Sequence, residues 1–277
     1  MPASEVFAPD LLDGEVALVT GGGTGLGKAA AAELAACGAQ VVVAGRREEV
    51  VSAAASEIGC EWATGDVRSP EDAARLVGVA LERYGRLDIL VNNAGGQYFA
   101  PAEAIEAKGW RAVMALNVGG ILEMSSAAFE GAFRAAGRGT IVNVTLSPHH
   151  GLTGMVHSSA ARAAAEGLTR ELAERWAGDG VAVIAAAAGH FKTDALEKYP
   201  EAVREGAART VPLQRLGRPE EHAWLIALIA SPLGRALSGS TVTLDGARDN
   251  WFGPWPPPNL QGESGEVPIE ERRPVRH

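Results

Sequence analysis

A glycine-rich turn near the start of the chain has the residue types and spacing of a phosphate cradle. The sequence TGGGTGLG, residues 20–27, stands between the β-branched run Val16–Thr20 and the Ala-rich helical run Lys28–Cys37. Glycine lacks a Cβ atom, so the chain can turn sharply and approach a pyrophosphate, whose charge then faces the free N–H groups of the helix. A flexible turn without a ligand is the plainer alternative. The order of strand, glycines and helix favours a dinucleotide site whose members are Gly21, Gly23, Thr24, Gly25, Leu26 and Gly27.

The residues after the second β-branched run, Gln40–Ala44, indicate which dinucleotide is bound. Gly45, Arg46 and Arg47 follow that run directly. An acidic side chain at this point would accept a hydrogen bond from a ribose 2′-hydroxyl, whereas guanidinium groups match a 2′-phosphate. Arg46 and Arg47 therefore predict NADP(H) as the cofactor, the alternative being that both arginines only face water.

Two further segments follow strands and are expected at the same edge of a sheet. Asp66 and Val67 come after the weaker run Glu61–Gly65, and the Asp66 carboxylate can accept a hydrogen bond from an adenine amino group. A turn-forming aspartate before a helix explains the same spacing equally well. The segment after the run Asp88–Val91 contains Asn93, Ala94 and Gly95. Because ligands of open α/β sheets bind at the carboxyl ends of the strands, both segments are candidate cofactor contacts.

The elements that would position these residues are short strands alternating with Ala-rich helical stretches. Helix-length connections require right-handed crossovers and a parallel sheet that is buried on both faces. We therefore predict one α/β domain, a doubly wound Rossmann-type domain over residues 1–250, followed by a Pro/Gly-rich C-terminal tail over residues 251–277. The helix Ser69–Tyr84 supports the division, since Ser69 can cap it and Pro70 suits its first turn. The seven expected strands are Val16–Thr20, Gln40–Ala44, Glu61–Gly65, Asp88–Val91, Thr140–Thr145, Val181–Ala187 and Thr241–Leu244.

Composition argues against several other classes of protein. The chain has 25 Lys and Arg against 34 Asp and Glu, so its net charge of −9 would repel nucleic acid. Cys37 and Cys60 lack the spacing of a disulfide or metal site, and no metal is expected. The acidic N-terminus does not resemble a signal peptide, and the apolar stretches 181–188 and 223–230 are too short to cross a bilayer. We expect a cytoplasmic protein with a small-molecule substrate and no membrane partner.

An ordered set of motifs carries a resemblance to a known family. TGGGTGLG, the Asp66-Val67 pair, NNAG, Asn117 and the closing pattern RLGRPEE…SG…LDG resemble the short-chain dehydrogenase/reductase family over about residues 10–248. The resemblance implies a seven-stranded Rossmann-type sheet, hydride transfer to or from a nicotinamide, and a homotetramer. Stretches such as NNAGGQYFAPAEAIEAKGW and HSSAARAAAEGLT look like the peroxisomal trans-2-enoyl-CoA reductases, with 2,4-dienoyl-CoA reductases and bacterial terpenoid-alcohol dehydrogenases also similar.

The same resemblance locates the catalytic register, where this chain departs from the common pattern. Most of the family has a Tyr and a Lys four residues apart; here the matching positions are Ser158 and Arg162, while Thr145 matches the catalytic Ser and Asn117 the helix Asn. A serine is a poor proton donor at neutral pH and an arginine stays protonated, so this pair cannot copy the Tyr–Lys proton relay. Fixed donors can still stabilise the enolate oxygen that develops when hydride adds to an enoyl thioester.

The group that would protonate the substrate carbon is left open by the sequence. The displaced Tyr of the dienoyl reductases matches Ser147 here, and the Tyr of the enoyl reductases matches Glu166, so both phenols are absent. An imidazole can donate a proton at neutral pH. Ordinary loop or cap-flanking roles are the alternative for these histidines, and packing is the alternative for the nearby phenols. The candidates are His149, His150, His157, Tyr98 and Tyr199.

The segment after the sixth strand also departs from the family's pattern. Ala188-Gly189 and Thr193 stand where the family has Pro-Gly-x-x-x-Thr. By resemblance, the backbone at Gly189 touches the nicotinamide carboxamide and Thr193 reaches it or the pyrophosphate. Losing the proline loosens the turn.

Three functions fit these observations. The first is NADP(H)-dependent reduction of the activated C=C bond of an enoyl thioester. The second is a carbonyl or alcohol dehydrogenase for a hydrophobic alcohol or aldehyde, terpenoids included. The third is an NADP-binding protein with little turnover, since Ser158 and Arg162 replace the usual catalytic pair.

Overall fold

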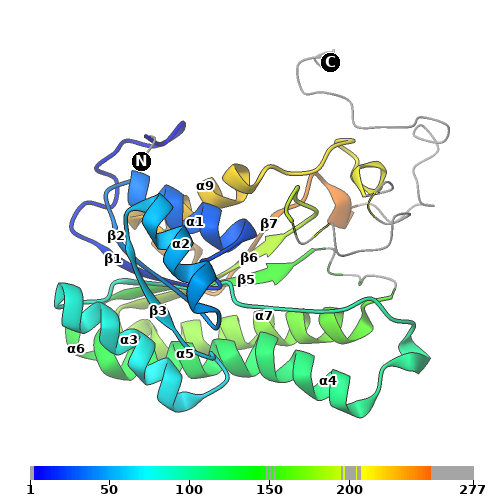
Figure 1. The fold of residues 1–277 in the computed structure, drawn as a ribbon, viewed down its shortest axis with the longest axis horizontal. Coiled ribbons are helices and arrows are strands. Elements are labelled where there is room, and N and C mark those ends of the chain that lie inside the picture. The colour runs from blue at the N-terminus through cyan, green and yellow to red at the C-terminus, as the bar shows by residue number, and fades with distance from the viewer. Residues whose placement is uncertain are drawn as a thin grey trace.

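The structure, a computed structural model, describes residues 3–147, 149, 151, 154–194, 196, 204 and 207–250. The predicted tail, residues 251–277, lies outside the described residues, as do His150 and Tyr199. The described chain forms one α/β unit around a single sheet (Figure 1).

Seven parallel strands form the sheet, in the order β3-β2-β1-β4-β5-β6-β7. This confirms the predicted doubly wound, seven-stranded Rossmann-type fold. The chain runs outward from β1 to β3 and then returns to start again at β4, so the strand order reverses between β1 and β4. Ligands of such sheets bind at the carboxyl ends of the strands beside this reversal. The strands are β1 (Val16–Thr20), β2 (Gln40–Gly45), β3 (Glu61–Thr64), β4 (Ile89–Asn92), β5 (Gly139–Leu146), β6 (Val181–Ala188) and β7 (Thr241–Leu244).

Helices cover both faces of the sheet (Figure 1). One apolar cluster joins the sheet to α1 (Gly25–Ala36), α2 (Glu48–Ile58) and α9 (Pro219–Ala230). The other cluster joins the opposite face to α3 (Pro70–Tyr84), α5 (Gly120–Ala128) and α7 (Val156–Trp176). Central strands that are buried on both faces must be apolar along their whole length, which explains the continuous runs of β1 and β6.

The start of α3 shows how a local sequence signal positions a site residue. Ser69 accepts a hydrogen bond from the backbone N–H of Asp72 at 3.1 Å, and Pro70 occupies the first turn, as predicted. The Asp72 carboxylate in turn accepts a 2.8 Å hydrogen bond from the backbone N–H of Asp66. The cap of α3 therefore fixes the backbone at Asp66, directly after β3.

A long helical run, Ala107–Ala136, covers the sheet beside α3 and α7. It contains two π-helical segments, η2 (Ala115–Gly119) between α4 (Ala107–Met114) and α5, and η3 (Phe129–Phe133) before α6 (Arg134–Ala136). The run is long and apolar enough to cross a membrane by length and composition alone, but 44% of its most apolar window is buried inside the protein. A helix that packs against the core of a soluble domain has the same properties.

Two helix boundaries differ from the sequence-based expectation. Helix α1 begins at Gly25 rather than Lys28, so the end of the glycine turn lies within the first turn of the helix. Helix α7 begins at Val156, so His157 and Ser158 lie inside its first turn and Ser158 is not an N-cap.

Candidate active site

The glycine turn after β1 has the shape of an anion cradle. Gly21 and Gly25 have φ angles of 64° and 52°, in the left-handed region that disfavours a side chain. A Cβ atom on Gly27 would lie 2.2 Å from the Asn93 amide nitrogen. The first turn of α1 contains no acidic residue, and Thr24 makes no side-chain cap, so the positive end of this helix is left for an anionic ligand. This fits a pyrophosphate.

Asn93 and Thr20 hold this turn against the end of β4. The Asn93 amide donates to the carbonyl oxygens of Thr20 and Gly21, at 3.0 and 3.2 Å. The Thr20 hydroxyl oxygen accepts from the backbone N–H groups of Asn93 and Ala94, at 3.1 and 3.0 Å. Asn93 therefore positions the cradle rather than pointing its side chain at the ligand.

The adenosine end of the expected site holds an arginine, Arg68, that was not among the predicted site residues. Arg46 and Arg47 follow β2 and are exposed. The Asp66 carboxylate accepts a 2.9 Å hydrogen bond from Nε of Arg68. This bond, with a smaller contribution from the charge of Arg46, lowers the pKa of Asp66 to about 2. The signal in the sequence was the spacing Asp66-x-Arg68, which lets one side chain fold back on the other.

Val67 plays a packing role. It is buried, and a Cβ atom on Gly120 would lie 2.7 Å from its side chain, so it packs against the start of α5. Its neighbour Asp66 remains the polar group at this position.

Asn117 fixes the backbone that leads from β4 into the cleft. It is fully buried within the π-helical segment η2. Its amide donates to the carbonyl oxygens of Gly96 and Val113, both at 2.8 Å, and its oxygen accepts from the Gly96 N–H at 3.1 Å. A Cβ atom on Gly95 would lie 2.8 Å from that oxygen. Glycine at position 95 is therefore required by the close approach of Asn117.

Arg162 lies between the ends of β4 and β5. One guanidinium nitrogen, Nη1, donates to the carbonyl oxygen of Val144 at 2.8 Å. The other, Nη2, would be 2.5 Å from a Cβ atom on Gly95. The positive charge of Arg162 is thus held between the end of β5 and the backbone that follows β4.

Ser158 is buried and turns toward a residue that was not predicted. Its hydroxyl donates a 2.8 Å hydrogen bond to the side-chain oxygen of Gln97. Gln97 follows the NNAGG segment directly, which was the available signal for its place in the cleft.

Thr145 and Glu166 meet one helical turn beyond Arg162. The Thr145 hydroxyl donates to Oε1 of Glu166 at 3.0 Å, and both side chains are buried. Residues 158, 162 and 166 are spaced by four, so they share one face of α7. Position 166, where the resembling enoyl reductases have a Tyr, therefore carries a carboxyl group next to Thr145.

The histidine candidates His149 and His157 lie in different surroundings. His149 contacts Glu166, with 2.9 Å between Nε2 and Oε1. His157 is fully buried, packs edge-on against Tyr98 with 4.4 Å between ring centroids, and neither ring nitrogen has a hydrogen-bond partner among the described residues. Burial lowers the pKa of His157, which favours its neutral form and a packing role. Ser147 is held by a hydrogen bond to the Asp245 carboxylate.

The segment after β6 lies against the end of β7. Gly189 donates its N–H to the Leu244 carbonyl oxygen at 3.0 Å, and a Cβ atom on it would lie 2.6 Å from Cα of Asp245. The β7 end therefore requires glycine here even without the preceding proline. A Cβ atom on Gly25 would lie 3.8 Å from the Thr193 side chain, so Thr193 faces the glycine turn.

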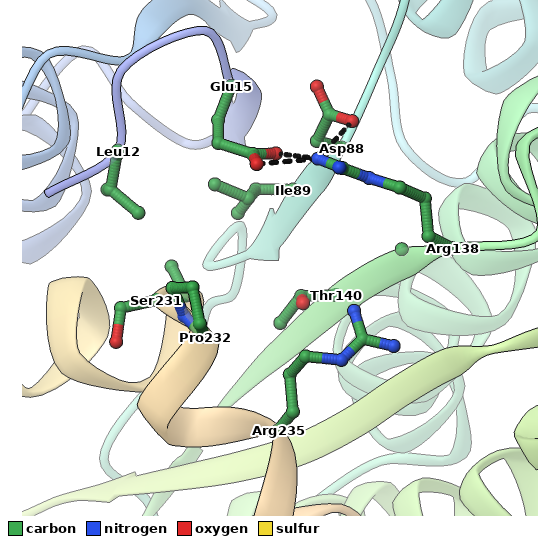
Figure 2. Close-up of a pocket in the computed structure, with 11 residues that line it drawn as sticks. Leu12, Glu15, Asp88, Ile89, Arg138, Thr140, Ser231, Pro232 and Arg235 are labelled. Carbon is green, nitrogen blue, oxygen red and sulfur yellow. Dashed lines mark hydrogen bonds and ion pairs between the residues drawn. The ribbon is translucent and has the colours of Figure 1, made fainter.

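A cavity at the opposite, amino end of the strands has a different character (Figure 2). Its volume is about 320 Å³, and its lining includes Glu15, Asp88, Arg138 and Arg235. Arg138 pairs with Glu15 and also reaches Asp88 at 3.0 Å, while Asp88 accepts from the Val16 N–H at 3.0 Å. These charges tie the starts of β1, β4 and β5 together, far from the glycine turn. No group of metal-ligating side chains is found among the described residues.

The fold and the glycine cradle have the features of a dinucleotide-binding domain, and comparison with known proteins gives the family. Residues 21–247 match the family model described as enoyl-(acyl carrier protein) reductase. A probable 2,4-dienoyl-CoA reductase of Bacillus subtilis is 36% identical over 258 residues, covering 88% of this chain and all of the relative. The peroxisomal 2,4-dienoyl-CoA reductase of Arabidopsis thaliana is 34% identical over 259 residues, covering 87% and 86% of the two chains.

A solved structure shows the same similarity. The citronellol catabolism dehydrogenase of Pseudomonas aeruginosa PAO1 is 37% identical, with a TM-score of 0.80 over 90% of this chain and all of the other. The chain belongs to the short-chain dehydrogenase/reductase family, as its motifs predicted. Members of this family use nicotinamide cofactors, and this protein is an oxidoreductase.

Proposed function

We propose that the protein is an NADPH-dependent reductase of the activated C=C bond of an acyl thioester. The observation that carries the proposal is the arrangement at the cleft of Ser158, Arg162, Thr145 and Glu166. It lacks a phenol–lysine pair but places a permanent cation and a buried carboxyl group on one face of α7. The similarity to 2,4-dienoyl-CoA reductases supports an enoyl or dienoyl thioester as the substrate.

The chemistry of C=C reduction suits these groups. Bound NADPH supplies a hydride to the β-carbon of the substrate, and negative charge develops on the thioester oxygen. Arg162 is fixed by its bond to the Val144 carbonyl, so its charge is in place before the reaction and need not reorganise. Ser158 and Thr145 are hydroxyl donors that can turn toward the same oxygen. We assign the stabilisation of the enolate to these three residues.

The α-carbon then needs a proton, and Glu166 is the acid in our proposal. Its carboxyl group is buried beside Thr145, where a protonated form can hand its proton to carbon. The O–H bond of Glu166 breaks as the C–H bond forms, which leaves the carboxylate to be reprotonated. An alcohol dehydrogenase would instead protonate an oxygen, for which the family uses its tyrosine.

The choice of NADPH rests on the positive charge beyond β2 and β3. Arg46 and Arg47 follow β2, and Arg68 pairs with Asp66 after β3. Arg68 is already engaged by Asp66, so the guanidinium groups of Arg46 and Arg47 are the ones that favour a ligand with a 2′-phosphate.

The acyl chain has an apolar rim available beside Ser158. Tyr98, Phe99 and Val156 are 38%, 41% and 45% exposed, although large apolar side chains usually avoid water. The backbone of Ala100 donates to the Gly154 carbonyl oxygen at 2.9 Å, which brings these two segments together. This rim supports a hydrophobic substrate.

A second candidate function is a dehydrogenase for hydrophobic alcohols or aldehydes, which the likeness to the citronellol catabolism dehydrogenase favours. Parallel assays with crotonyl-CoA, a 2,4-dienoyl-CoA and citronellal, each with NADPH and with NADH, distinguish the two. Our proposal expects NADPH oxidation with a thioester. Oxidation with citronellal alone would favour the second candidate, and binding of NADPH without turnover of any of the three would indicate a binding protein.

A further inference from the structure

His149 lies between two carboxyl groups that come from different parts of the chain. Its Nε2 is 2.9 Å from Oε1 of Glu166 on α7, and its Nδ1 is 2.5 Å from Oδ2 of Asp249 in η8 (Arg248–Asn250). The backbone N–H of His149 also donates to Asp249, at 2.6 Å. A neutral imidazole has only one N–H, so two such contacts with carboxyl groups require an additional proton, held either by the imidazole or by one of the carboxyl groups. The cluster therefore stores a proton next to Glu166.

The exposure of these side chains changes along the cluster. Thr145 is 2% exposed, and the side chains of Glu166, His149 and Asp249 are 10%, 32% and 22% exposed. Glu166 is thus largely shielded from water, whereas His149 touches solvent. A proton that leaves Glu166 for the substrate can be replaced through the imidazole.

The charges around His149 favour this role. Burial disfavours the imidazolium form, but the hydrogen bond to Asp249 and the charges of Glu166 and Asp249 outweigh it and raise the pKa of His149. Asp245 adds a third carboxylate to this side of the cluster, since it accepts a 2.8 Å hydrogen bond from the Asp249 N–H. The nearby cation Arg248 donates to the Thr210 carbonyl oxygen, and Arg162 lies one helical turn before Glu166.

We propose that His149, held by Asp249, is the relay residue that returns a proton to Glu166 in each turnover. This inference rests on the proposed function. When Glu166 gives its proton to the α-carbon, the Nε2–H bond of the imidazolium breaks and the O–H bond of Glu166 forms again. The neutral imidazole, still hydrogen-bonded to Asp249, then takes a proton from water. With the hydride from NADPH, the substrate gains two hydrogen atoms and one proton is consumed from solvent.

The test combines turnover with a measurement on the free protein. In His149→Gln, hydrogen bonding is retained but the proton relay is lost, so we expect kcat to fall about 10²-fold or more at pH 8, within the range of general acid–base effects. The loss should shrink toward pH 5, where hydronium is more abundant and can supply the proton without the imidazole. His149→Ala should recover part of its rate on addition of imidazole. Glu130→Gln, in an exposed pair with Arg134, is the matched control and should keep the parental rate and pH profile.

The free protein is examined by NMR titration of its histidine rings. We expect the His149 titration midpoint to fall in Asp249→Asn and to stay unchanged in Glu130→Gln. An unchanged kcat and pH profile in His149→Gln would overturn the relay. If the parent protein reduces no thioester, the proposed function fails. The NMR titration still tests the interaction of His149 with Asp249, and an unchanged His149 midpoint in Asp249→Asn would overturn the inference.

Discussion

The Thr145 hydroxyl donates a 3.0 Å hydrogen bond to the buried Glu166 carboxyl group, joining the end of β5 to the middle of α7. If Glu166 is the acid for the α-carbon, Glu166→Gln should lower kcat about 10²-fold or more while the hydrogen bond to Thr145 survives. The binding of NADPH should change little, because Glu166 lies away from the glycine turn. Steady-state kinetics with crotonyl-CoA check this. Glu174→Gln, at an exposed position of the same helix, is the matched control.

Substitutions of Arg162 test whether its charge stabilises the reaction or whether the residue is only structural. Its guanidinium group bonds to Val144 and lies over Gly95, so Arg162→Ala should lower kcat more than it weakens cofactor binding. Arg162→Lys should restore the charge without the two-pronged donor and recover part of the rate. Arg170→Ala, exposed on the same helix, should behave as the parent. Equal turnover in the parent and in Arg162→Ala would remove Arg162 from the proposed site.

The arginines after β2 determine the predicted cofactor preference. Replacing Arg46 and Arg47 together by Gln should weaken NADPH binding by about 1.5–3 kcal/mol, the usual value for a lost charged hydrogen bond, and leave NADH binding nearly unchanged. Isothermal titration calorimetry measures both affinities. Arg83→Gln, whose exposed ion pair with Glu61 lies at the start of β3, serves as the control. A NADPH/NADH affinity ratio that is the same in the double variant and the parent contradicts the assignment.

Two glycine positions give opposite expectations for stability. A Cβ atom on Gly27 would come within 2.4 Å of the Gly21 carbonyl oxygen, so Gly27→Ala should lower the melting temperature and weaken cofactor binding. Gly78 lies within α3 with no atom within 4 Å of a new Cβ. Gly78→Ala should therefore stabilise the protein by about 0.5–1 kcal/mol through helix propensity. A stabilised Gly27→Ala variant would show that the turn is not as closely packed as described.

The assembly state is a further prediction. Trp110 and Leu122 are 40% and 41% exposed on the long helical run, and β7 is an edge strand with a partly exposed face. Unpaired edges and exposed apolar side chains favour association between copies of a chain. We expect a homotetramer by light scattering, and Leu122→Glu should shift it to smaller species. A monomeric parent at micromolar concentration would refute the tetramer.

The sequence predicted the parts of the molecule that local patterns determine. The strand bounds of β1 and β7 match the expectation, and Ser69 caps α3 as proposed, because alternation, propensity and capping act over a few residues. The role of Asn93 as a brace for the glycine turn could not be predicted, since it depends on how β1 and β4 pair in space. The hydrogen bond between Ser158 and Gln97 could not be predicted for the same reason. Neither could the contact between His149 and Asp249, which are 100 positions apart in the chain.

The central claim is tested most directly by tracing the two hydrogen atoms that the substrate gains, one from the cofactor and one from the solvent. The enzyme is given crotonyl-CoA and NADPH that carries deuterium at the transferred position of the nicotinamide, first in H₂O, and then with unlabelled NADPH in D₂O. Mass spectrometry and NMR of the product locate the label. Our account predicts deuterium from the cofactor at the β-carbon and deuterium from the solvent at the α-carbon. In Glu166→Gln, the incorporation of solvent deuterium at the α-carbon should be slower. Recovery of unchanged crotonyl-CoA, together with cofactor deuterium at the carbinol carbon of citronellol when citronellal is offered, would contradict it.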